Sequence, residues 1–181
     1  KCNFTNNYIN YNSYMRDMSF NGLIFLRAAS GLIDGCIFTN NSIYFHSFEN
    51  YNYCIHGGII SLLKSNVYLN HCEFINNFGY CNSNYYHNFK IYGESIYLYQ
   101  SQMILNQCIF DANTIYSNYS SNFLNYGCEI YLYMSTGEIS ECKFTNFLLI
   151  SDITKSISIY GGIIHLNISH FTFNECTFHD C

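Results

Sequence analysis

The stretch GGIISLLKSNVYLNHCEFINN, residues 57–77, decides the fold because versions of it recur along the whole chain. Its Cys-x-Phe element occurs six times, and successive cysteines are 34, 36, 36, 34 and 34 residues apart. Ten residues before each of the last five cysteines stands a leucine, and twelve residues before it stands an isoleucine. A glycine precedes that pair in every unit, and an Asn-rich turn follows the phenylalanine. The chain is therefore a tandem repeat.

The apolar columns of each unit pair at a spacing of two, which is the period of a β-strand. Ser, Asn and Gly stand between the pairs and favour turns. Three short strands and three turns make one coil, and identical residues in identical columns imply that equivalent strands stack in parallel, ~4.8 Å apart. The sequence thus predicts an all-β fold, a right-handed parallel β-helix (a solenoid) with one coil of three short strands per 34–36-residue repeat.

We expect residues 1–181 to form a single β-helix segment, with repeat units at approximately 1–20 (partial), 21–56, 57–92, 93–126, 127–160 and 161–181. Variable inserts separate the constant parts and share no common pattern. Asn side chains at the turns are expected to form amide ladders along the axis. Because neither end carries a cap, we expect the segment to continue in a longer solenoid, or else to stack end to end.

The core is predicted from the recurring columns, in which the same residue type would stack on itself from coil to coil. These columns contain Cys36, Cys72, Cys108, Cys142, Cys176, Phe38, Phe74, Phe110, Phe144, Phe178, Ile24, Ile60, Ile96, Ile130, Ile164, Leu26, Leu62, Leu98, Leu132 and Leu166.

Composition excludes several classes of protein. Apolar residues make up 49% and charged residues 10%, which does not fit a disordered chain. The net charge of −5 argues against a nucleic-acid partner, which needs a clustered basic surface. Apolar runs are too short for a membrane span, so direct membrane insertion is not expected.

Two motifs of the repeat resemble a known family. The GGII sequences at 57–60 and 161–164 resemble the Gly-Gly-Ala-Ile motif of chlamydial polymorphic outer membrane protein repeats, and 38–41 and 74–77 resemble its Phe-x-x-Asn motif. Similar repeats, often with the added Cys-x-Phe, occur in large secreted or surface proteins of protists. The resemblance implies a β-helical stalk in adhesion or surface architecture, with no catalytic residues to carry over.

Ten cysteines suggest an oxidising compartment. Six lie in one inward column, where disulfides between neighbouring coils would be strained, so we expect buried thiols there. Cys54 and Cys81 occupy successive inserts and are the candidate disulfide. The inward column contains Cys2, Cys36, Cys72, Cys108, Cys142 and Cys176.

Glycosylation sequons occur at Asn3, Asn40, Asn118 and Asn167, and Asn118 is the best candidate because it lies in an insert. N-linked glycans are thus expected, and no other cofactor. Together with the cysteines, the sequons favour a secreted or cell-surface location.

A catalytic centre is not predicted. Glu141 and Glu175 share a column in adjacent coils, which would place them ~5 Å apart, near the separation in a retaining glycosidase. A solvated acidic edge is the plainer interpretation, and the same holds for Glu94 and Glu129. The seven histidines are scattered without a zinc-like spacing, so we expect neither a metal site nor an enzyme.

Four tyrosines form the predicted contact patch. Tyr97 and Tyr131 share one outer column, and Tyr99 and Tyr133 share the next. An exposed aromatic patch marks a contact with a neighbouring subunit or a sugar ring. The alternative is that the Tyr-rich inserts fold over this face and bury it.

The function expected from the sequence is a non-enzymatic structural segment of a secreted or cell-surface protein, within an extracellular assembly or filament. Its partners would be other protein subunits, including copies of itself. The alternative is an adhesin or glycan-binding stalk that uses the variable Tyr/Asn-rich inserts.

Overall fold

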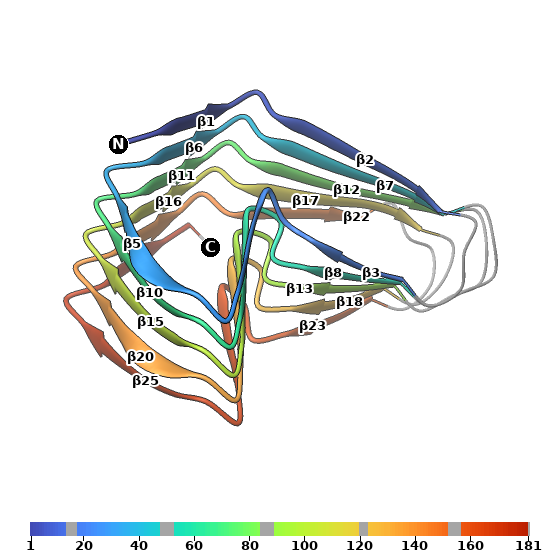
Figure 1. The fold of residues 1–181 in the computed structure, drawn as a ribbon. Helices are drawn as coiled ribbons and strands as arrows, with labels where there is room; N and C mark the ends of the chain where they lie inside the picture. Colours follow the sequence, from blue (N-terminus) through green and yellow to red (C-terminus); the bar gives the residue numbers. More distant parts are fainter. Residues whose placement is uncertain (14–17, 48–52, 84–88, 120–122, 152–156, 181) are drawn as a thin grey trace.

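The computed structural model describes residues 1–13, 18–47, 53–83, 89–119, 123–151 and 157–180. These residues form parallel β-strands and no helix. Each strand pairs with the equivalent strand 34 to 36 residues further along, so Phe38 lies beside Phe74 and Ile96 beside Ile130. The chain is therefore a parallel β-solenoid, as predicted (Figure 1).

Three sheets enclose the part of each coil that we call the body, and they contain the three strands predicted for each unit. The first sheet contains β1 (Asn3–Thr5), β6 (Ile37–Thr39), β11 (Glu73–Ile75), β16 (Ile109–Asp111), β21 (Lys143–Thr145) and β26 (Thr177–His179). The second contains β5 (Ser30–Asp34), β10 (Asn66–Asn70), β15 (Gln102–Asn106), β20 (Thr136–Ser140) and β25 (His170–Asn174). The third contains β4 (Ile24–Arg27), β9 (Ile60–Leu63), β14 (Ile96–Tyr99), β19 (Ile130–Tyr133) and β24 (Ile164–Asn167).

Two further sheets come from the inserts and face each other beside the body, forming what we call the arm (Figure 1). One contains β2 (Tyr8–Ser13), β7 (Ser42–Ser47), β12 (Phe78–Ser83), β17 (Thr114–Tyr119) and β22 (Leu148–Ser151). The other contains β3 (Met18–Asn21), β8 (Tyr53–His56), β13 (Phe89–Tyr92), β18 (Phe123–Tyr126) and β23 (Ile157–Tyr160).

The prediction of three strands per coil was wrong, because the inserts supply two more. Their strands also alternate, with Ile43 and Phe45 buried on either side of the half-buried Tyr44. The inward columns, however, change residue type between coils, as from Ile43 to Gly79. A search for identical residues at equivalent positions of the repeat could not reveal these strands.

Body and arm have separate cores. In the body, the phenylalanines of the predicted column stack with ring centroids 4.6–4.9 Å apart. The predicted core columns are buried in the inner coils, whereas Phe178 and Leu166 of the last coil are 51% and 41% exposed. The arm has its own cluster, comprising Ile43, Phe45, Ile55, Cys81, Ile91 and Ile115.

Residues in the left-handed backbone region form the corners between strands, and the same positions recur in each unit. Lys64, His71 and Asn76 have φ of 51°, 49° and 52°, and Gly57 has φ of 63°. A Cβ on Gly57 would lie 2.3 Å from the carbonyl oxygen of Ile60, so this corner requires glycine for space as well as for conformation.

Candidate functional site

A ladder of asparagines runs along the junction between body and arm, exposed at its first member, Asn7, and buried at the other three. It contains Asn7, Asn41, Asn77 and Asn113, each at the bend from the first body sheet into the arm. Each Nδ2 group donates to Oδ1 of the asparagine in the next coil, over 2.9–3.0 Å. The ladder ends at Asn113, because the next unit has Phe147 at this position.

The last amide of this ladder donates to a buried carboxylate. Asn113 Nδ2 lies 3.0 Å from Oε1 and 3.3 Å from Oε2 of Glu129. Ser95 Oγ lies 2.5 Å from Glu129 Oε2 and 3.1 Å from Glu94 Oε2, so one hydroxyl bridges two carboxyl groups. We call Glu94 and Glu129 the carboxyl pair.

The expectation that the carboxyl pair is solvated was wrong, because Glu94 is 4% and Glu129 is 1% exposed. Both residues lie on the turns that return the chain from arm to body, and these turns direct them inward. Burial and the charge of Glu129 raise the pKa of Glu94 well above its usual value. Burial also raises the pKa of Glu129, to about 7, against hydrogen bonds from Ser95 and Asn113 that lower it.

Space for Glu94 comes from a glycine in the arm. Gly79 stands in β12 where the neighbouring strands have Ile43 and Ile115. A Cβ built on Gly79 would lie 3.6 Å from Glu94 Cγ, an ordinary van der Waals contact, so alanine would fit at this position and only the atoms beyond Cβ of a larger side chain would compete with Glu94 for space. The buried side chain of Glu94 is thus accompanied by a glycine, in place of isoleucine, in the strand β12 that it packs against.

The predicted contact patch is not an exposed patch. Tyr97 and Tyr131 are 8% and 4% exposed, because rings from the arm cover them. Tyr92 packs edge-on against Tyr131, with ring centroids 4.8 Å apart. Tyr99 and Tyr133 stack at 5.4 Å and are half-buried. The alternative in which the inserts fold over this face therefore holds for the first column.

The candidate disulfide between Cys54 and Cys81 is not formed, since Cys81 is a free thiol in the arm core. Side chains alternate between the two faces of a strand, and this keeps the two cysteines apart. Cys81 faces inward, whereas Cys54 precedes the inward Ile55 and so faces the other side of its sheet. In the body column, the thiols cap carbonyl groups at the corners, as when Cys72 Sγ donates to Asn70 O over 3.3 Å.

The four sequons lie in different surroundings. Asn3, Asn40 and Asn118 are exposed, and Asn118 stands near the end of β17, while Ser120 of its sequon lies outside the described residues. Asn167 is half-buried, and its Nδ2 donates to Tyr131 Oη over 3.1 Å.

The acidic edge predicted at Glu141 and Glu175 is exposed. Gln107 Nε2 donates to Glu141 Oε2 over 2.7 Å, so this column is linked by hydrogen bonds at the surface. No group of three or more His, Cys, Asp or Glu side chains in the described part of the chain is arranged to hold a metal ion.

A second aromatic stripe was missed by the sequence analysis. Tyr44, Tyr80 and Tyr116 are half-buried and follow one another along β7, β12 and β17. The rings of Tyr80 and Tyr116 stack with centroids 5.3 Å apart, and the ring of Tyr44 is tilted against Tyr80 at 5.4 Å. The three tyrosines alternate with the buried residues of these strands and so face away from the arm core. The signal was a tyrosine eight residues after the cysteine in three consecutive units. We call these three residues the tyrosine stripe.

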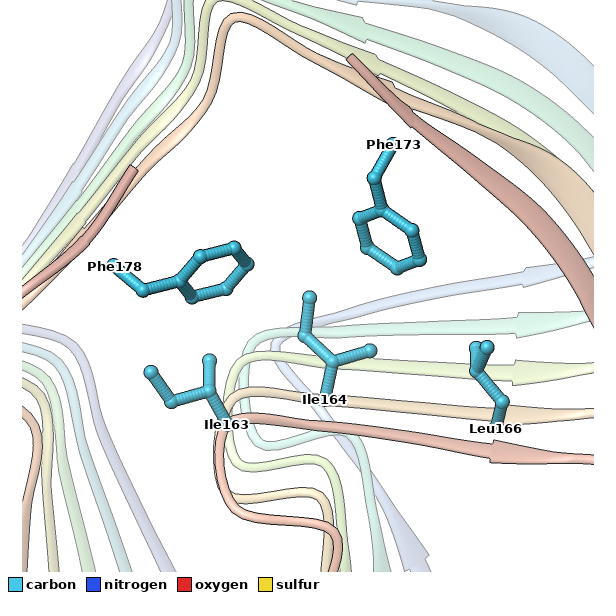
Figure 2. A pocket seen from close by; sticks show the side chains of 5 residues that line it. All are labelled: Ile163, Ile164, Leu166, Phe173 and Phe178. Carbon is cyan, nitrogen blue, oxygen red and sulfur yellow. The ribbon is translucent and has the colours of Figure 1, made fainter. Parts of the chain in front are cut away.

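The last coil presents an apolar hollow of about 550 Å³ at the end of the body, lined by side chains that point into it (Figure 2). We call this surface the C-terminal end face, and it comprises Ile163, Ile164, Leu166, Phe173 and Phe178. The first coil has a smaller hollow of about 310 Å³, whose lining includes Phe4, Ile24 and Ile33.

Among the described residues no helix is long and apolar enough to span a membrane. No family model, no curated protein and no solved structure matches this chain.

Proposed function

We propose that this chain is a non-enzymatic structural segment of a secreted or cell-surface solenoid within an extracellular assembly, and that its end coils stack on further coils of the same repeat. The observation that carries the proposal is the repetition of the same apolar columns in every coil, so that each end of this segment offers the surface that a further coil would cover. Phe178 and Leu166 are 51% and 41% exposed at the C-terminal end face, whereas their equivalents Phe144 and Leu132 are 1% and 0% exposed under the next coil.

The two ends of the solenoid are complementary because they present the same columns. Phe4 and Ile24 at the first coil match Phe178 and Ile164 at the last. A second copy placed on the C-terminal end face would continue the same phenylalanine and isoleucine stacks. It would also pair the open strand edges, which otherwise favour association with other chains.

The surface location is supported by the exposed sequon residue Asn118 and by the resemblance to polymorphic outer membrane protein repeats. A non-enzymatic role is supported by the burial of Glu94 and Glu129, since a substrate has no access to carboxyl groups that are 4% and 1% exposed.

Negative-stain electron microscopy of the 181-residue chain tests the assembly. We expect filaments, and we expect Leu166→Ser with Phe178→Ser to abolish them, because both changes place hydroxyls in the stacking interface. Ile168→Ser is the matched control: Ile168 is 73% exposed in a corner column whose members are exposed in coil after coil. Isolated rods from the unmodified chain, or filaments that survive the double substitution, would refute end-to-end stacking.

A glycan-binding stalk is the second candidate, and the tyrosine stripe favours it. The rings of Tyr80 and Tyr116, stacked 5.3 Å apart on an outer sheet face, offer flat apolar surfaces to sugar rings. Binding of soluble polysaccharides that is lost in Tyr80→Ser, while Tyr99→Ser retains it, would favour this function. Equal binding by the two variants would exclude the stripe as the contact.

A further inference from the structure

The carboxyl pair and its bridge connect the two sides of the junction between body and arm. Glu94 and Ser95 lie where the chain passes from β13 in the arm to β14 in the body, and Asn113 lies where it passes from β16 to β17. Hydrogen bonds run from Glu94 through Ser95 and Glu129 to Asn113. These bonds therefore join the turn that leaves the body to the turn that returns to it.

The bridge can be satisfied when the pair holds one proton. A serine hydroxyl has a single proton to donate, yet Ser95 Oγ is in hydrogen-bond contact with an oxygen of each carboxyl group. The second contact is a hydrogen bond when the carboxyl on that side is protonated and donates to Oγ. With both carboxyls ionised, one carboxylate oxygen would face a lone pair of Oγ in a buried space, which is strongly unfavourable.

The surrounding donors place the negative charge on Glu129. Both of its oxygens lie within 3.3 Å of Asn113 Nδ2, at the end of a ladder whose N–H groups all point in this direction. Aligned hydrogen bonds polarise one another and favour charge at the accepting end. Ser95 Oγ donates a further hydrogen bond to Glu129 Oε2, and such bonds are stronger when the carboxylate is charged.

We propose that Glu94 keeps its proton at neutral pH and donates it to Ser95, and that loss of this proton at alkaline pH opens the junction between arm and body in the two central coils. The acid form closes the junction because every contact of the bridge is then a hydrogen bond. The basic form places a second negative charge in the same buried space, next to that of Glu129.

The groups around the pair supply no compensating cation among those that the structure describes. Cys128, on the turn beside Glu129, is the other titratable group coupled to both carboxyls, and burial raises its thiol pKa to about 12. Ser95 and Asn113, which form hydrogen bonds with the pair, and Gly79, which lies next to Glu94, carry no charge. The ion pairs recorded for the described residues involve Asp34 and Asp180 and not this pair.

The sign of the pH dependence follows from proton linkage. A carboxyl that stays protonated in the folded state binds more protons there than in the unfolded chain, so stability falls as the pH rises above the ordinary glutamate value of 4.5. One retained proton raises the unfolding equilibrium constant by about tenfold per pH unit. Between about pH 6.5 and 8.5, the constant should rise by about 100-fold from this group alone.

Glu94→Gln tests the proposal because glutamine keeps a donor toward Ser95 and cannot lose it. We would measure urea unfolding of the unmodified chain and the variant over that pH range. The ratio of their unfolding constants should change by about 100-fold. Glu175→Gln, at an exposed carboxyl, should follow the unmodified chain. A ratio that stays constant within about threefold would refute the proposal.

A direct titration keeps the proposal testable should Glu94→Gln fail to fold. In the chain labelled with carboxyl-¹³C glutamate, the Glu94 signal should remain that of a protonated acid at pH 8, where Glu129, with a pKa of about 7, is mostly ionised. Hydrogen exchange at the backbone amide of Ser95, which donates to Glu129 O, should then accelerate with Glu94 ionisation beyond the intrinsic pH effect. Two ionised carboxyls at pH 8, or a proton that stays on Glu129 at that pH while Glu94 is ionised, would overturn it.

Discussion

Asn77→Ala is expected to destabilise the solenoid more than any single surface change, because Asn77 lies in the middle of the asparagine ladder and is fully buried. Its Oδ1 accepts from the backbone N–H and from Nδ2 of Asn41. Its Nδ2 donates to Phe38 O and to Asn113 Oδ1. Alanine removes all four bonds and leaves their partners in a space closed to solvent.

The magnitude follows from the count of bonds. At about 1 kcal/mol for each net hydrogen bond, four bonds predict a loss of about 4 kcal/mol in the free energy of unfolding. For a chain of this size, that corresponds to a fall of about 8–16 °C in the melting temperature. The ladder is continuous, so the loss is also expected to weaken the neighbouring rungs.

Circular dichroism during urea and thermal unfolding measures this change. Asn66→Ala is the matched control, since Asn66 is an exposed asparagine of β10 and its loss should change stability by about 0.5 kcal/mol or less. A loss below about 1 kcal/mol for Asn77→Ala would refute the view that the ladder holds body and arm together.

Three further changes test the core, a corner and a half-buried histidine. Phe110→Ala should cost about 3–5 kcal/mol in urea unfolding, and Phe178→Ala much less, because Phe110 is fully buried and Phe178 is 51% exposed; equal losses would contradict the burial argument. Ile168→Asn should raise the free energy of unfolding by about 1 kcal/mol, because a β-branched residue has φ of 52° there; Ile109→Asn in the extended β16 should give no gain, and a gain at both sites would count against backbone strain. Burial lowers the pKa of His56 to about 4, so its contribution to stability should be lost as the pH falls from about 6.5 through 4; an unchanged acid profile in His56→Asn would show that its titration is not linked to folding.

The body could be predicted from sequence because its columns keep both position and residue type. Phe74 and Phe110 occupy one column, and their rings stack 4.6 Å apart. The presence of the same residue type at the same position of each repeat was enough to predict this stacking. The arm satisfies the same alternation with residues that differ from coil to coil. Its inward column passes from Ile43 to Gly79 to Ile115, so position was retained while identity was not.

The carboxyl pair could not be placed inside by residue type, since Glu is rarely buried without a partner. A positional signal was present nevertheless. Counted back thirteen residues from the cysteine, Glu129 stands in the same column as Ile59 and Ile163 of other units, and Ile59 is 1% exposed. A glutamate in an isoleucine column is an inward glutamate when the backbone repeats.

Glu94 and Glu129 both depart from the column pattern, and each departure is compensated by a residue in its own or the adjacent coil. This is expected for a solenoid, in which each coil contacts only its neighbours. Glu94 replaces a glycine column residue and is accommodated by Gly79 in an otherwise bulky arm column. Glu129 accepts the hydrogen bond from Asn113 Nδ2 that an asparagine of the next coil would otherwise accept, because Phe147 stands at that position and has no acceptor. Because the hydrogen bonds of the carboxyl pair are made within one coil or between adjacent coils, the neighbouring coils of the body keep their apolar columns, and this site stays confined to the centre of the solenoid.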